Sequence, residues 1–210
     1  MKPHRALPRR KAASGIAAIE MGFLLPILIF LTLPVIDFGR AIQANQILVN
    51  LTREGASIAS RDPDDTPQYI MDTLSATTPP LKMQQRGMIY ITKVMGYCAT
   101  GGANCSATTV VLEQYQWQSG WKQANGAMPA SKIWNCGSGG SSWASDGSCG
   151  GIPTGKNAPT INYMTNELHD GNVAYIVEAY YNFDMLFSGL SLGGMSMPTI
   201  GPNLYSVTVF

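Results

Sequence analysis

Charged residues are scarce in this chain of 210 residues. Asp, Glu, Lys and Arg together make up 13%, about half of the ~25% that is usual in soluble domains. The 14 basic and 13 acidic residues almost cancel, whereas nucleic-acid binding needs clustered Lys and Arg to neutralise phosphates. Apolar residues still make up 45%, which is too many for a disordered chain. The composition therefore predicts a folded protein that binds no nucleic acid.

Histidine is even scarcer, and the usual catalytic and metal-binding patterns are missing. His4 and His169 are far apart in the sequence, so neither has a partner for a metal site. The stretch 150–157 resembles a phosphate-binding loop, but it ends in Asn instead of the hydroxyl residue that would bind magnesium. An acidic cluster lacks the glycine and the later Glu of a calcium loop: Asp62, Asp64 and Asp65. We therefore predict no enzyme activity, no bound metal and no cofactor.

The few charges are unevenly distributed along the chain. Residues 1–15 hold five bases and no acid, and the apolar stretch Ile16–Ile36 follows with one charged residue, Glu20. At 1.5 Å per residue such a helix is ~32 Å long, enough to cross a hydrocarbon core of ~30 Å. The basic flank would lie in the cytoplasm and the rest of the chain outside. A cleaved secretory signal is the alternative, although its apolar region is usually only about 7–15 residues long.

Glu20 lies inside the apolar stretch, where an acid in mid-helix costs about 2.5–3.5 kcal/mol on insertion scales. Because it is near the end of the stretch, its carboxylate would reach the lipid headgroups in the simplest interpretation. A second interpretation uses the preceding residues. If the chain is cut after Gly15, Ile16 carries a new α-amino group, and Glu20 is the fifth residue of the product. The ammonium of a neighbouring subunit would then neutralise Glu20 in lipid, where an unpaired charge is expensive.

An ordered set of residues begins at this site and continues to about residue 60. Its members are Gly15-Ile-Ala-Ala-Ile-Glu20-Met21, Pro26, Asp37-Phe38-Gly39-Arg40, Asn50 and Arg53-Glu54-Gly55-Ala56. Together they resemble the TadE-like family, the minor pseudopilins of the tight-adherence (Tad/Flp) pilus system, with a processing site like that of type IV prepilins. Two positions depart from the family pattern: Met21 replaces the usual aromatic residue, and Asp37 replaces the more usual Glu.

The resemblance implies a pseudopilin precursor of the bacterial inner membrane. A prepilin peptidase would remove the leader, residues 1–15, between Gly15 and Ile16, and Glu20 would pair with a neighbouring subunit. The partners would be the lipid bilayer, the peptidase and other pilus subunits, and the pilus would serve adhesion or secretion. The alternative is an uncleaved single-pass binding protein or adhesin. A membrane-anchored enzyme is the weakest hypothesis, because the catalytic residues are missing.

The membrane helix is expected to continue beyond the bilayer, so that residues 16–60 form one segment. Apolar and small residues recur at helical spacing between Ala44 and Ile58, which predicts a stripe that faces a core. Asp62-Pro63 ends this helix, because the residue before a proline disfavours helical geometry. Thr66-Pro67 then begins a short helix that runs to about Ser75.

Four later stretches have the composition of strands: 88–95, 108–117, 172–183 and 204–210. In the second stretch, simple alternation places four residues on one face: Val111, Glu113, Tyr115 and Trp117. The sequence thus predicts an extracytoplasmic α+β domain, residues 61–210, in which the long helix packs on a small antiparallel sheet. Pilin-like folds share this architecture.

All four cysteines follow the membrane span: Cys98, Cys105, Cys136 and Cys149. An oxidising compartment favours disulfides, and four cysteines allow three pairings. Proximity in the sequence favours Cys98 with Cys105 and Cys136 with Cys149. A zinc site is the alternative, but the spacings do not match the usual close cysteine pairs.

Residues 136–151 form a segment of low complexity in which six of sixteen residues are Gly. One interpretation is a flexible surface loop that a disulfide closes at its base. The other is a contact loop with Trp143 as its anchor, because a lone aromatic residue in a polar loop can act as a binding hot spot. We favour the first, because no other residue there has recognition chemistry.

Overall fold

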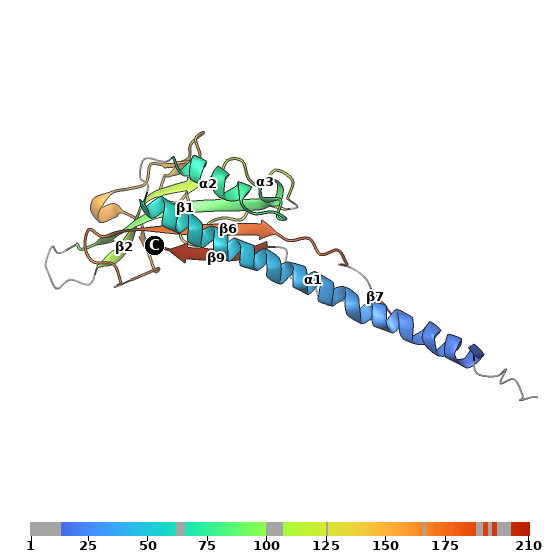
Figure 1. Ribbon diagram of the computed structural model, residues 1–210. Helices are drawn as coiled ribbons and strands as arrows, with labels where there is room; N and C mark the ends of the chain where they lie inside the picture. Colours follow the sequence, from blue (N-terminus) through green and yellow to red (C-terminus); the bar gives the residue numbers. More distant parts are fainter. Residues whose placement is uncertain are drawn as a thin grey trace, which may run out of the picture. The chain divides into compact units, whose positions relative to one another are not determined.

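The computed structural model describes residues 14–61, 66–99, 107–124, 126–165, 167–187, 191–192, 195–196 and 203–210. The chain divides into two compact units. The first comprises Met1–Arg40 and Met185–Ile200, and the second comprises Ala41–Asp184 and Gly201–Phe210. The helix α1 (Ser14–Arg61) belongs to both units (Figure 1).

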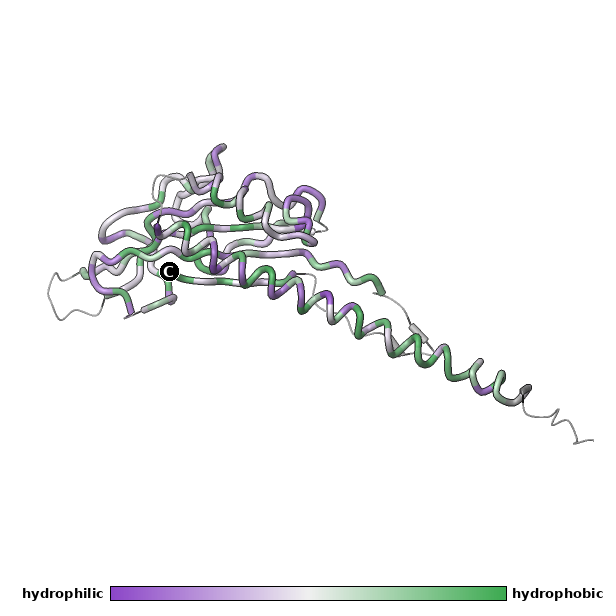
Figure 2. The backbone as a smooth tube through the Cα atoms, in the orientation of Figure 1, coloured by the Kyte–Doolittle hydropathy of each residue, from purple (hydrophilic) through white to green (hydrophobic). Residues whose placement is uncertain are grey.

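In the first unit, α1 carries a long apolar surface. Its large hydrophobic side chains are mostly exposed, as in Phe23 (74%) and Val35 (67%), and Figure 2 shows this half of the helix as predominantly hydrophobic. Within the described residues, α1 is the one helix long and apolar enough to cross a membrane. Pro26 and Pro34 lie inside this helix, and membrane helices tolerate internal prolines better than soluble helices do. The antiparallel strands β7 (Ser191–Leu192) and β8 (Met195–Ser196) also belong to this unit.

The second unit is built on one antiparallel sheet of five strands in the order β5-β2-β1-β6-β9. The strands are β1 (Gly87–Tyr97), β2 (Thr108–Gln116), β5 (Thr160–Ile161), β6 (Val173–Asn182) and β9 (Asn203–Val209). The four long strands occur where the sequence predicts them, whereas β5 has only two residues, too few to show an alternating pattern. The expected α+β fold is confirmed.

Helices cover one face of this sheet. Most of the predicted stripe of α1 is buried there, namely Ala44, Leu48, Leu51 and Gly55, whereas Ile47 and Ile58 are half-buried. Ala56 and Ala59, which were not part of the predicted stripe, are buried as well. A Cβ built on Gly55 would lie 2.7 Å from Leu74 and 3.3 Å from Val177, so the glycine allows the close approach of α1 to α2 (Pro67–Ala76) and to β6. As predicted, α1 ends at Arg61 and Thr66 caps α2, its side chain accepting a hydrogen bond from the Tyr69 amide at 3.3 Å.

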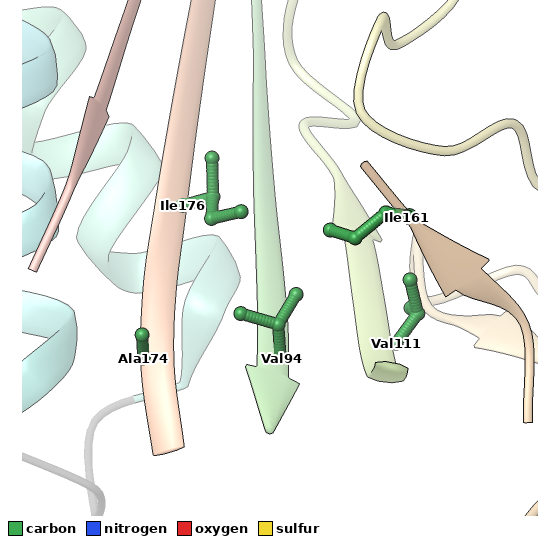
Figure 3. Close-up of a cluster of buried hydrophobic side chains, with 5 residues drawn as sticks. All are labelled: Val94, Val111, Ile161, Ala174 and Ile176. Carbon is green, nitrogen blue, oxygen red and sulfur yellow. The ribbon is translucent and has the colours of Figure 1, made fainter. Parts of the chain in front are cut away.

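The opposite face of the sheet carries a second apolar core. Figure 3 shows its five central side chains across four strands: Val94, Val111, Ile161, Ala174 and Ile176. Partly buried residues of the irregular segments between β2 and β6 pack on them, among them Ile133, Trp134, Ile152 and Leu168. This loop layer also contains β3 (Ser142–Trp143) and β4 (Cys149–Gly150). The short helix α3 (Met83–Arg86) precedes β1.

A β-bulge corrects one prediction for β2. Lys93 pairs with Glu113, but the next residue of β1, Val94, pairs with Val111, so Leu112 has no partner in the ladder. The extra residue reverses the alternation. Val111 therefore lies in the second core, on the face opposite to Glu113 and Tyr115, and not on their face as simple alternation predicted.

Candidate functional site

The predicted processing and pairing residues lie in the first turns of α1. The helix begins at Ser14, so Gly15 and Ile16 are both helical, and Gly15 is exposed. Glu20 is exposed as well, between Ile19 (63% exposed) and Met21 (61%). The basic residues of the leader lie outside the described residues. The carboxylate of Glu20 thus lies on an open apolar surface, and its role in pairing subunits stays a prediction.

Asp37 is a buried acid on the otherwise exposed surface of the same helix. Its exposed fraction is 0%, whereas Val35 is 67% exposed and Phe38 is 40% exposed. Its two carboxylate oxygens accept backbone hydrogen bonds from Leu186 at 3.0 Å and from Phe187 at 2.9 Å. The Arg40 guanidinium donates to the same carboxylate at 3.0 Å. Asp37 therefore fixes the start of the β6–β9 connection against α1.

Sequence analysis identified Asp37 only as part of the motif Asp37-Phe38-Gly39-Arg40, and it could not predict which groups donate hydrogen bonds to its carboxylate. Leu186 and Phe187 follow it by 149 and 150 positions, and no local pattern joins them. A signal was nevertheless present, because Asp37 is the first charged residue after the apolar stretch and precedes Arg40 by three positions. That spacing brings the two side chains together on one face of a helix.

A second buried acid, Glu178, lies within β6 on the face of the sheet that the loop layer covers. Its exposed fraction is 0%, and its carboxylate accepts hydrogen bonds from the Ser131 hydroxyl, the Lys132 amide at 2.9 Å and the Tyr205 hydroxyl at 3.0 Å. Tyr180 donates to the Ala130 carbonyl at 3.0 Å. These bonds attach residues 130–132 to the sheet.

The tyrosines beside Glu178 are electrostatically coupled to it. Burial, and then the negative charge of Glu178, raise the pKa of Tyr90, Tyr180 and Tyr205 above the ordinary tyrosine value. The Lys132 ammonium lies 3.9 Å from the ring centre of Tyr205, and an ammonium over an aromatic face is attracted by the ring. Each group in this cluster has a partner within the fold, so we interpret it as structural.

The loop segment 136–151 is closed by a disulfide between Cys136 and Cys149, as proximity in the sequence favoured. Trp143 is half-buried, and its ring centre lies 6.1 Å from that of Tyr90. Part of its surface therefore packs on the domain, while its role as a contact anchor stays a prediction. Cys98 is buried at the end of β1, and its expected partner Cys105 lies outside the described residues.

A metal-binding cluster is not found in the part of the chain that the structure describes, where no three His, Cys, Asp or Glu side chains could hold a metal ion. His169 is exposed, in the turn before β6. The stretch that resembles a phosphate-binding loop contains only the short 3-10 helix Gly155–Asn157. It lacks the long helix whose N-terminus would bind phosphate.

Comparison with models of protein families gives a match to the model described as TadE-like protein, over residues 15–57. Comparison with curated proteins and with solved structures gives no match. The matched stretch contains Glu20, Asp37 and Gly55, and it extends from the membrane-length half of α1 into the half that packs on the sheet. The N-terminal region of this chain, residues 15–57, is therefore similar to the TadE-like protein family.

Proposed function

We propose that the protein is the membrane-anchored precursor of a minor pseudopilin, a structural subunit for the assembly of a Tad/Flp-type pilus. The single observation that carries this proposal is that one continuous helix has both an exposed apolar half and a half buried against a sheet, within a TadE-like region. A subunit of this design can be stored in the bilayer and still present a folded domain to its neighbours.

The proposed processing step is cleavage by a prepilin peptidase between Gly15 and Ile16. It would release the basic leader and leave Glu20 as the fifth residue of the mature chain. Because Glu20 is exposed among apolar side chains, its charge needs a partner in lipid. The new α-amino group of an adjacent subunit has the charge and the depth to be that partner.

The proposed topology follows from the charge distribution. The five bases of residues 1–15 favour a cytoplasmic N-terminus, which puts the sheet-bearing domain on the outer side of the inner membrane. The Cys136–Cys149 disulfide supports this side, because disulfides persist in oxidising compartments. Adhesion or secretion by the assembled pilus would be the biological outcome.

The intact mass of the protein extracted from its native membranes tests the proposal. We expect the mass of a chain that lacks residues 1–15, and the full-length mass when the peptidase gene is deleted. The matched control is the same chain expressed without any pilus genes, which should keep its leader. A full-length mass in the native host would refute the pseudopilin assignment and favour the uncleaved single-pass binding protein.

A further inference from the structure

Leu186 and Phe187, which Asp37 fixes against α1, begin a stretch of unusual composition. Residues 185–200 include no charged residue, and they begin with Met185, Leu186 and Phe187. Leu186 is 63% exposed and Phe187 is half-buried. Single exposed apolar residues are common on proteins, but this one lies beside a helix whose own apolar residues are also exposed.

The depth of the segment follows from the position of Asp37. Asp37 directly follows the apolar stretch Ile16–Ile36, so in a helix that spans the bilayer it lies at the outer edge of the hydrocarbon core. Its bonds to the Leu186 and Phe187 amides hold these two residues at the same level. Arg40, one turn further out and 41% exposed in its side chain, would lie at the depth of the lipid phosphates.

We propose that Met185–Phe187 is a second membrane contact, which inserts Leu186 into the outer leaflet beside α1. The inference rests on the proposed membrane anchoring and goes beyond it, because it assigns a lipid-binding role to a loop remote in sequence from the helix. Lipid is the occupant that the site favours, because the exposed Leu186 is bonded through its amide to Asp37, and the residues of α1 just before Asp37, Val35 and Ile36, are exposed and apolar as well. The backbone amides of Leu186 and Phe187, which would be costly to bring into lipid unpaired, are already satisfied by Asp37.

Site-specific photo-crosslinking in proteoliposomes tests this contact. The full chain with Leu186→p-benzoylphenylalanine is reconstituted into vesicles of phosphatidylethanolamine and phosphatidylglycerol, irradiated, and analysed by intact mass. We expect an adduct of one phospholipid. The same replacement at Val35 is the control for lipid contact, and the replacement at Glu167, an exposed charged residue of the second unit, is the control for water exposure.

The outcomes separate this inference from the proposed function. Lipid adducts at Val35 and Leu186 but not at Glu167 support it. Two outcomes overturn the inference and leave membrane anchoring intact. In both, Val35 gives a lipid adduct, whereas Leu186 gives either no adduct or an adduct to a second copy of the protein. Failure at both positions contradicts the membrane anchoring itself, on which the proposed function depends.

The role of Asp37 is tested in the same vesicles. Asp37→Ala should cause loss of the lipid adduct at position 186 but not at Val35, because the segment is no longer held at a fixed depth. Asp37→Glu, which keeps the carboxylate, should restore it. An undiminished adduct at position 186 in Asp37→Ala would show that Asp37 does not position the segment.

Discussion

The indole nitrogen of Trp117 donates a hydrogen bond to the Asp72 carboxylate at 2.7 Å, and this bond joins the end of β2 to α2. Trp117 is completely buried, so its N–H needs a partner inside the fold. The pair shows how α2 is attached to the sheet. Apolar packing holds the helix against the sheet, and the charge-assisted hydrogen bond between Trp117 and Asp72 fixes its orientation.

Trp117→Phe should destabilise the second unit by about 2–4 kcal/mol, because the smaller ring leaves a cavity and Asp72 loses its donor. Thermal unfolding of the full chain in detergent, followed by near-UV circular dichroism, measures the change. Trp121→Phe is the matched control, since the long 3.4 Å contact of its indole with the Gly126 carbonyl is near the limit for a hydrogen bond. Equal losses in the two variants would contradict the role of the buried bond.

Gly55→Val should also destabilise the second unit, by about 1–3 kcal/mol, because the added atoms overpack a filled interior. A Cβ at this position already meets Leu74 at 2.7 Å and Val177 at 3.3 Å. Chemical denaturation of the full chain in detergent measures the loss. Gly39→Val on the same helix is the control, because nothing lies within 4 Å of a Cβ there. If Gly55→Val were as stable as the control, α1 would not be packed closely on α2 and β6.

The fold around these two contacts could be predicted from the sequence only in part. The stripe of α1, its end before Asp62-Pro63, the cap at Thr66 and the four long strands were predictable because each depends on residues that are neighbours in the sequence. The bulge at Leu112 was not, because a pairing register depends on the partner strand.

The same limit on sequence-based prediction applies to the acidic residues of the candidate sites. Glu20 was recognisable because a charge in an apolar stretch is conspicuous by itself. The burial of Asp37 and of Glu178 was not predictable, because the donors that compensate it come from distant segments: 186–187 for Asp37, and 131–132 with Tyr205 for Glu178. Only the tertiary structure brings these groups together.

The stability of the second unit should fall as the pH rises above about 10, the ordinary pKa of tyrosine. Burial and Glu178 raise the pKa of Tyr90, Tyr180 and Tyr205, so above that pH the unfolded chain loses these protons while the folded chain keeps them. Proton linkage then favours the unfolded state. The contribution of these three tyrosines to the free energy of unfolding is therefore fully present below about pH 10 and is lost progressively above it.

Tyr180→Phe removes one of the three coupled hydroxyls and should make this alkaline loss shallower, by up to about 1.4 kcal/mol per pH unit. Denaturant titrations between pH 8 and about pH 11 measure the slope. Tyr69→Phe is the control, because Tyr69 is 59% exposed and its replacement should leave the slope unchanged. An unaltered slope in Tyr180→Phe would show that its hydroxyl ionises as readily in the folded chain as in the unfolded one.

Glu20→Ala should leave membrane insertion intact and abolish pilus assembly. Insertion depends on the apolar stretch, which the change makes more apolar, whereas assembly depends on the proposed pairing of Glu20 with the N-terminus of a neighbour. Membrane fractionation measures the first property, and counting pili by electron microscopy measures the second. Glu167→Ala, which removes an exposed acid of the second unit, should be normal in both. Because an uncharged side chain in lipid needs no partner, normal piliation in Glu20→Ala or Glu20→Val would mean that the acid does not pair subunits.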